Sequence, residues 1–261
     1  MLTQVQIDAL AQDIFAQHER RETFVPFPDR VPSMEDAANI QDAYVALLKK
    51  KLNTDVGGYK IALTSKQTRD WLKIHEPCIG QLLSNRIHRS PHTLKVSDYV
   101  RFSVETEICI VMDRDIAGEV SFDEVRNAVR SIHCAYELVE DRAADLTRLD
   151  ARSLVSDNSW NGGIVMGPPA ADPRMELSGL AGRLKVNGKQ TNEGTTAETI
   201  GGNPLHVIVW LAGHLGKRGR VLKAGQPVIT GSIIATQFPG PGDELEFAAD
   251  GIPPVVLKLV P

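Results

Sequence analysis

One strand of the protein is predicted by the run Val104-Glu105-Thr106-Glu107-Ile108-Cys109-Ile110-Val111-Met112, which is apolar apart from its glutamates and one threonine. Such a run is typical of a strand that is buried on both faces. Side chains alternate along a strand, so Glu105 and Glu107 point to the same face. Burying two like charges side by side costs free energy unless a counter-charge cancels them. Carboxylate oxygens suit Mg²⁺, so the run predicts half of a metal site.

A third carboxylate is expected near this pair. Glu137 lies in Ala135-Tyr136-Glu137-Leu138-Val139, another apolar run with one acidic residue, and a strand–helix–strand connection could return it to Glu105 and Glu107. Three converging carboxylates would supply half the ligands of an octahedral cation and leave positions for substrate and water. The alternative is that Glu105 and Glu107 lie on the wet face of an edge strand. The residues alone leave both interpretations open.

Length and composition narrow the class of protein. A chain of 261 residues can form one large domain, or a small N-terminal unit with a larger one. Its 42% hydrophobic and 24% charged residues are ordinary for a globular protein, and a net charge of −4 gives no reason to expect nucleic acid or a membrane as partner. The cysteines lack metal-ligand spacing, and no signal peptide or membrane-span pattern is present, so we expect free thiols and a cytoplasmic location.

The N-terminal part predicts two helices. Residues 3–20 carry apolar side chains at helical spacing, and a proline-rich connector follows. Ser33 then resembles an N-cap, and the helix behind it ends in Lys49-Lys50-Lys51, where basic residues suit the helix dipole. We therefore expect a helical cap over residues 1–56.

From Gly57 onward, short strand patterns are mixed with isolated helices and many Gly/Pro turns. Asn187-Gly188 predicts a hairpin turn, and Asn203-Pro204 predicts the start of the last helix. Another helix is predicted from Ser121, with one apolar face formed by Val125, Ala128, Val129 and Ile132. The fold class is therefore α+β, with residues 57–261 forming a β-rich catalytic domain on a mixed, curled or barrel-like sheet.

Lys60 is a further candidate for chemistry because it lies within the short apolar strand pattern Tyr59–Leu63. A lysine there is either a surface residue or a fixed positive charge for an anionic substrate, with a role in acid–base chemistry. Thr64 and Ser65 directly follow the strand and could donate hydrogen bonds to a carboxylate.

Three loop segments are weaker candidates, since each also fits an ordinary turn or strand end. Ser156-Asp157-Asn158 suits a loop that lines a polar pocket, and Thr230-Gly231-Ser232 could offer backbone N–H groups to an anion. His75-Glu76-Pro77 is a candidate acid–base pair in a loop. The GxGxxG, GxxxxGK[ST], GxSxG, HExxH and CxxC motifs are all missing, so nucleotide cofactors and serine-type hydrolysis are not indicated.

Several of these segments occur in an order that is typical of one family: Gly58–Lys66, Val104–Ile108, Tyr136–Val139, Ser156–Asn158, Gly202–Leu205 and Ala224–Ser232. Together they resemble the 2-keto-4-pentenoate hydratase and 4-oxalocrotonate decarboxylase family, within the fumarylacetoacetate hydrolase superfamily. The resemblance spans nearly the whole chain, including the N-terminal helices. The sequence departs from the usual family pattern in the residues before Glu105 and at Ala62 and His75. These departures affect the fit of the substrate more than the binding of the metal.

The resemblance implies a β-rich core of the fumarylacetoacetate hydrolase type, Mg²⁺ or Mn²⁺ as cofactor, and homo-oligomers. It implies Glu105, Glu107 and Glu137 as metal ligands and Lys60 as a catalytic residue. His75 and Glu76 would lie in a loop that closes over the site and would donate a proton or activate water. The expected substrate-binding residues are Thr64, Ser65, Asp157, Asn158, Thr230, Gly231 and Ser232.

The implied activity is hydration of a 2-hydroxy-2,4-dienoate (2-oxo-4-enoate) to a 4-hydroxy-2-oxo acid in aromatic meta-cleavage catabolism. A 4-oxalocrotonate-type decarboxylase is the alternative. It needs a pocket for a second substrate carboxylate, which Arg101, Lys66 or Arg69 could bind. An acylpyruvate-type C–C hydrolase and a non-catalytic relative with the same fold also remain open. The expected partners are a small 2-oxo or 2-hydroxydienoic acid, further copies of the chain, and a sister enzyme of the same pathway.

Overall fold

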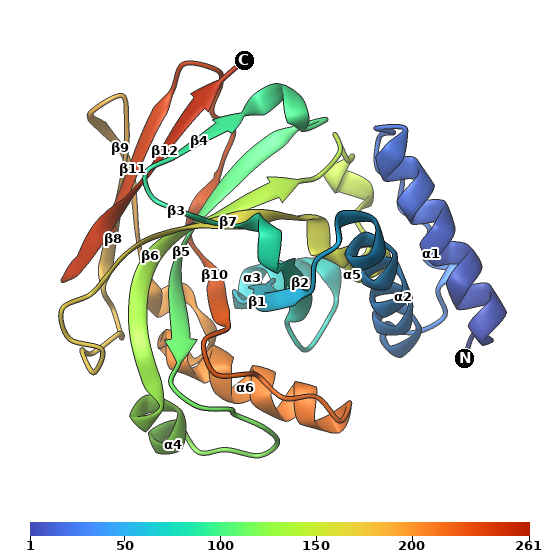
Figure 1. Cartoon of the computed structure of the whole chain (residues 1–261), viewed down its shortest axis with the longest axis horizontal. Helices are drawn as coiled ribbons and strands as arrows, with labels where there is room; N and C mark the ends of the chain where they lie inside the picture. Colours follow the sequence, from blue (N-terminus) through green and yellow to red (C-terminus); the bar gives the residue numbers. More distant parts are fainter.

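The computed structural model describes residues Met1–Pro261 and contains two sheets flanked by helices (Figure 1). The larger sheet has seven strands in the order β2-β1-β10-β5-β6-β7-β3. Its strands are β1 (Val56–Ala62), β2 (Cys78–Leu83), β3 (Ile87–Arg89), β5 (Phe102–Met112), β6 (Val129–Glu140), β7 (Asn161–Pro169) and β10 (Pro227–Gln237). The architecture is the expected mixed, curled sheet with helices.

The smaller sheet has five strands in the order β4-β12-β11-β8-β9. Its strands are β4 (His92–Lys95), β8 (Ala181–Val186), β9 (Lys189–Thr195), β11 (Glu244–Ala249) and β12 (Ile252–Val260). The two sheets share one apolar core, in which Phe247 and Leu257 of the smaller sheet pack with Ile108 and Tyr136 of the larger one. The hairpin at Asn187-Gly188 is confirmed, and both residues have the positive φ that such a turn requires.

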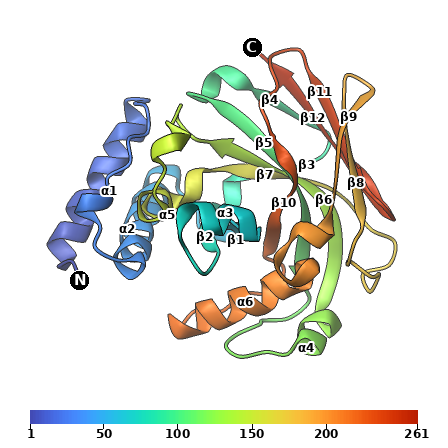
Figure 2. The ribbon, with the colours of Figure 1, turned by 180° about the vertical axis from the view of Figure 1, so that it is seen from behind.

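The helices are α1 (Gln4–Glu19), α2 (Met34–Leu52), α3 (Lys66–Leu72), α4 (Phe122–Asn127), α5 (Ala151–Ser156) and α6 (Pro204–Lys217). The first two lie together on one side of the molecule, where a separate apolar cluster joins Ile14 and Ile40 to Leu83 of β2 and Val155 of α5 (Figure 1). Seen from behind, α6 and α4 lie together at one end of the larger sheet (Figure 2). None of these helices is both long and apolar enough to cross a membrane.

Strand β5 lies between β10 and β6, so the edge-strand alternative for Glu105 and Glu107 is wrong. One face of β5 sends Val104, Ile108 and Ile110 into the core between the sheets. The other face carries both glutamates and continues into a small apolar cluster that includes Cys109 and Val111. Both faces are therefore covered, as the apolar run predicts.

The helix predicted from Ser121 ends earlier than its apolar spacing indicates. Ser121 caps α4 and exchanges hydrogen bonds with Glu124, but the helix stops at Asn127. Val129 and Ile132 instead begin β6, whose backbone pairs with β5 and β7. A spacing that fits a short helix also fits a strand, and here the pairing on both sides of β6 favours the strand.

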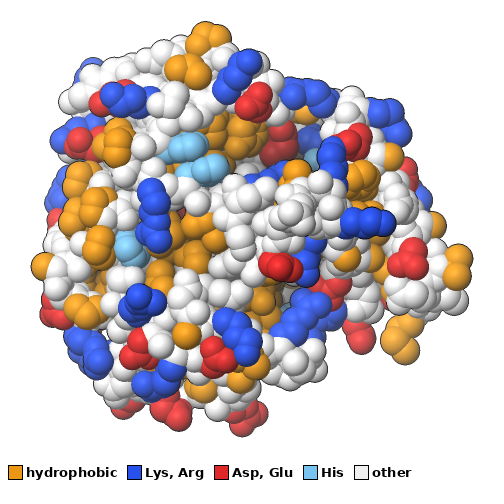
Figure 3. All heavy atoms as spheres, in the orientation of Figure 1, with side chains coloured by type: hydrophobic (Ala, Val, Ile, Leu, Met, Phe, Trp, Pro, Cys, Tyr) orange, Lys and Arg blue, Asp and Glu red, His pale blue; other side chains and the backbone are white.

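Acidic and basic side chains are interspersed over the face of the molecule shown in Figure 3. The protein also has exposed ion pairs, such as Lys185 with Glu246 and Arg183 with Asp250. Exposed pairs of this kind contribute little to stability.

Candidate active site

The pairing of β5 with β6 brings three glutamates together. Glu105 lies opposite Glu137 in the register, and Glu107 lies two residues farther along the same face. One carboxylate oxygen from each residue lies within 4.8 Å of the corresponding atoms of the other two. Glu107 and Glu137 are each only 1% exposed, and Glu105 is half-buried. The predicted connection through one helix therefore returns the chain to the expected place.

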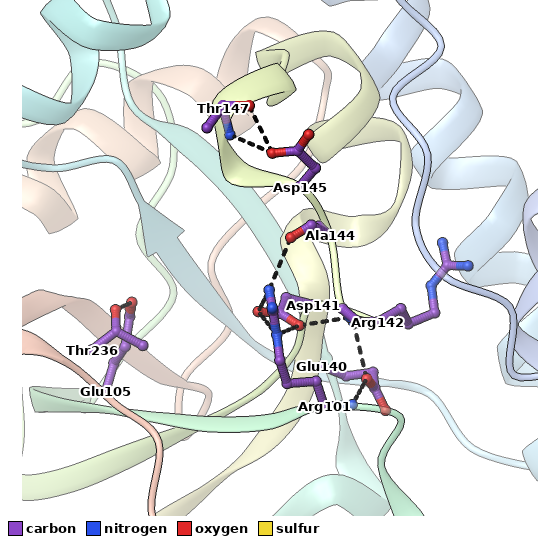
Figure 4. A network of polar contacts seen from close by, with 10 residues as sticks. Arg101, Glu105, Glu140, Asp141, Arg142, Ala144, Asp145, Thr147 and Thr236 are labelled. Atoms are coloured by element: carbon purple, nitrogen blue, oxygen red, sulfur yellow. Dashed lines mark hydrogen bonds and ion pairs between the residues drawn. The ribbon is translucent and has the colours of Figure 1, made fainter.

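The protein satisfies only some of the oxygens in this cluster. The Gly231 N–H donates a hydrogen bond of 2.6 Å to Glu107 Oε2, and Thr236 Oγ1 donates one of 2.5 Å to Glu105 Oε1 (Figure 4). Glu107 Oε1 and Glu137 Oε2 are buried without a hydrogen-bond partner. A buried carboxylate oxygen without a partner is costly, so these atoms fit a cation that prefers oxygen ligands.

Lys60 places one positive charge against the three carboxylates. It lies on β1 and is 4% exposed, and its Nζ lies 2.6 Å from Glu137 Oε1. Burial alone would lower the pKa of Lys60, but the attraction of the carboxylates, led by Glu137, raises it. Burial and the neighbouring carboxylates raise the pKa of Glu107 well above its ordinary value, and burial raises that of Glu137 to about 7 despite Lys60. The raised pKa values show that one lysine does not balance three ionised carboxylates, so the fully ionised cluster needs a further cation.

A cavity of about 170 Å³ lies against Lys60 and Glu105. Four of the predicted substrate-binding residues line it, namely Thr64, Ser65, Gly231 and Ser232. Gly231 has a φ of +100°, and a Cβ atom there would lie 2.0 Å from Thr64 Oγ1. A glycine is therefore required where β10 passes the lysine strand.

Three other predicted substrate-binding residues have side chains that are engaged by the protein. Thr230 Oγ1 donates to the backbone of β5. The amide of Asn158 accepts from and donates to the backbone of Gln81, at 2.7 and 3.0 Å. Asp157 accepts a hydrogen bond from Arg142 and pairs with His18, each at 2.5 Å. None of the three lines the cavity beside Lys60.

The Asp157 contacts form a buried network that holds the turn after α5. Burial opposes the charge of Asp157, yet His18 and Arg142 together keep its pKa below the ordinary value. Ser159 and Trp160 follow in this turn, with φ angles of 52° and 57°, and both line the cavity. Asp157 and Asn158 therefore fix the backbone that presents Ser159 and Trp160.

His75 and Glu76 lie in a different place from the other predicted site residues. Both are exposed, and they line a second cavity of about 450 Å³ bounded by α2, β2 and the C-terminal end of α6. Neither residue lines the cavity beside Lys60.

Sequence reasoning missed most of the cavity wall. Ser159 and Trp160 belong to the polar run 155–163, which the sequence suggests as a pocket-lining loop, but neither is a predicted site residue. Thr236, which contacts Glu105 outside the cavity lining, had no signal in the sequence. The other missed residues that line the cavity are Ile61, Ala62, Leu63, Thr68, Val139, Leu149 and Leu154.

Comparison with known proteins identifies the family of the chain. Residues 64–260 match the model of the fumarylacetoacetate (FAA) hydrolase C-terminal family. The chain belongs to this family. A 2-keto-4-pentenoate hydratase of Paraburkholderia xenovorans is 30% identical over 261 residues, with 96% of this chain and 94% of that protein covered. A 2-hydroxyhexa-2,4-dienoate hydratase of Comamonas testosteroni is 27% identical, with 94% of each chain covered.

A solved structure has the same fold as this FAA hydrolase family member over its whole length. The 4-oxalocrotonate decarboxylase of Pseudomonas putida, complexed with magnesium and adipate, superposes with a TM-score of 0.91. The superposition covers 100% of this chain and 99% of that one, at 23% identity. The family and fold expected from the sequence are thus confirmed.

Proposed function

We propose that this protein is a metal-dependent hydratase that converts a 2-hydroxy-2,4-dienoate, the enol of a 2-oxo-4-enoate, to a 4-hydroxy-2-oxo acid in aromatic meta-cleavage catabolism. The observation that carries the proposal is the convergence of three glutamates beside one buried lysine at a small cavity. The names of the two hydratases described above support the same reaction.

Glu105, Glu107 and Glu137 would hold a divalent cation, Mg²⁺ or Mn²⁺, because the donor set consists of oxygens and carries an excess of negative charge. The unpartnered oxygens of Glu107 and Glu137 support this assignment. When bound, the cation would supply Lewis-acid polarisation of the substrate's carboxylate and C2 oxygens.

The chain's own groups would bind the acid and handle its protons. Lys60 Nζ would hold the negative charge that develops on the C2 oxygen, and the hydroxyls of Thr64, Ser65 and Ser232 would orient the carboxylate. The C2 hydroxyl gives up its proton, and C5 takes one, which leaves a 2-oxo-3-enoate. Water then adds its hydroxyl to C4 and a proton to C3, so the net change is the addition of one water.

His75 and Glu76 are proposed as the acid–base pair for these proton transfers. Because they line the neighbouring cavity, this role requires residues 66–77 to fold over Lys60. His75→Gln and Glu76→Gln test the role. A lowered turnover number with an unchanged Michaelis constant supports it, and full activity in both variants removes it.

The decisive experiment is incubation of the purified chain with Mg²⁺ and 2-hydroxypenta-2,4-dienoate. Loss of the dienol absorbance, formation of 4-hydroxy-2-oxopentanoate and inhibition by a chelator are expected. No loss of absorbance would overturn the hydratase. Release of CO₂ from 4-oxalocrotonate would favour a decarboxylase, and acid release from an acylpyruvate would favour a C–C hydrolase.

We further propose that the chain forms homo-oligomers and associates with a sister enzyme of its pathway. Light scattering of the purified chain tests the first proposal, and co-purification of the two enzymes tests the second. A monomer at micromolar concentration would contradict self-association.

A further inference from the structure

The far wall of the cavity is apolar. Leu63, Val139, Leu149, Leu154 and Trp160 form this part of the lining, and Lys60 and Glu105 line the same cavity. Val139, Leu154 and Trp160 belong to one buried apolar cluster, and the other two pack against that cluster. The wall is therefore part of a packed core, and it offers a substrate chain mainly apolar contact, with the unpartnered indole N–H of Trp160 and the hydroxyls of Thr68 and Ser159 as neutral polar groups and no positive charge.

Lys60 is the only cationic residue that lines this cavity, and its ammonium already pairs with Glu137. A second carboxylate on the substrate would need another cation. Arg101 directly precedes β5, which carries two of the proposed metal ligands, but its guanidinium donates three hydrogen bonds of 2.6–2.9 Å to Asp141 and one to Ala144 O (Figure 4). Its charge is therefore already neutralised elsewhere.

The other nearby cations are also engaged. Arg69 donates to the carbonyl oxygens of Leu63 and Thr64, and Lys66 forms an exposed pair with Asp70. Arg142, which is almost fully buried, donates to Asp157. None of these three residues lines the cavity.

We infer that the site takes 2-hydroxy-2,4-dienoates with a short uncharged, apolar end and discriminates against those that carry a second carboxylate at that end. The inference rests on the proposed function and names the substrate class within it. An unpaired carboxylate placed against an apolar wall loses its hydration without compensation. Each methylene added to a monoacid and buried there should instead improve binding by about fourfold.

The first test compares three substrates with the purified, Mg²⁺-loaded chain: 2-hydroxypenta-2,4-dienoate, 2-hydroxyhexa-2,4-dienoate and 2-hydroxyhepta-2,4-diene-1,7-dioate. We expect the methyl-ended acid to have a kcat/KM equal to or above that of the unsubstituted acid. The diacid should fall at least about 100-fold below it. A diacid that reacts within tenfold of the monoacids overturns the inference.

A binding measurement separates this inference from the proposed function. Calorimetry compares 2-oxohexanoate with 2-oxohexane-1,6-dioate, neither of which can be hydrated. If no dienoate is turned over, the proposed function fails, yet a diacid that binds at least tenfold more weakly still supports the inference. Equal affinities overturn it whatever the turnover results.

Leu149 provides a matched pair of variants because it lines the cavity and is only partly buried. Leu149→Lys adds a cation at the apolar end, and Leu149→Met keeps the length without the charge. We expect the ratio of diacid to monoacid kcat/KM to rise at least tenfold in Leu149→Lys relative to Leu149→Met. Equal ratios in the two variants would show that a missing cation is not the cause of the discrimination and would overturn the inference.

Discussion

Replacing Glu107 with glutamine removes an ionisable carboxyl, whose pKa the cluster raises, and nearly preserves the side-chain volume. If both carboxylates were ionised, two full charges 4.8 Å apart, the upper limit of the oxygen separations here, would repel by about 3.5 kcal/mol at an effective dielectric constant of about 20, and keeping Glu107 neutral also costs free energy. The substitution also removes attraction to Lys60. We therefore expect the free energy of unfolding of the metal-free variant to rise by a net 1–2 kcal/mol, roughly 2–8 °C in unfolding temperature.

The opposite change is expected with metal present. A cation at about a hundred times its dissociation constant stabilises the folded state by about 2.7 kcal/mol. For a chain of this size that corresponds to about 5–10 °C. Glu107→Gln should lose most of this shift, because one of its three proposed ligands has become a neutral amide.

The assay is thermal unfolding of the wild type and the variant at pH 8, first in chelator and then in millimolar Mg²⁺. Glu193→Gln is the control, because Glu193 is exposed and lies outside the cluster. The control should keep the wild-type response in both conditions. A Glu107→Gln protein that unfolds at lower temperature without metal, and still gains the full Mg²⁺ shift, would refute the crowded metal-binding cluster.

Three further substitutions probe the surroundings of the site. Asp157→Asn leaves the buried Arg142 without its counter-charge and should lower the free energy of unfolding by about 3–5 kcal/mol in urea titrations. Because its partners lower the pKa of Asp157 in the folded state, the wild type should lose stability as pH falls below 3.8. The free energy of unfolding of the variant should lack this dependence on pH, and the same dependence in both proteins would contradict the pairing. Gly231→Ala pushes a methyl group into Thr64 and should lower both kcat/KM and the unfolding temperature, whereas wild-type values would remove the steric argument. Thr236→Val should weaken Mg²⁺ binding about 10–100-fold by calorimetry, and an unchanged affinity would count against an orienting role.

The convergence of Glu105, Glu107 and Glu137, the proposed metal ligands, could be found from the sequence because each step uses a local rule. Alternation along β5 puts Glu105 and Glu107 on one face, and the cost of burying them calls for a counter-charge. Glu137 followed from a second run of the same kind, and the register confirms that it faces Glu105.

The rest of the site depends on contacts between distant parts of the chain. Asp157 suits a polar pocket by residue type, but His18 of the N-terminal helix α1 engages its carboxylate. Leu149 and Leu154 became part of the cavity only when α5 and the segment before it packed beside Trp160. No local pattern in a sequence reports such packing, and the same is true of the early end of α4.

The four strands β1, β10, β5 and β6 are consecutive in the larger sheet, and they supply Lys60, Gly231, the two glutamates of β5, and Glu137. The register of the hydrogen-bonded strands therefore sets the relative positions of these side chains. A shift of one residue in the register of β6 would turn Glu137 to the opposite face of the sheet. The apolar end of the cavity comes largely from the segment after β6. The proposed reacting residues and the proposed substrate-selecting residues therefore lie in different parts of the chain. Mutations in the segment after β6 can change which acid is accepted without altering the strand register that positions the glutamates and Lys60.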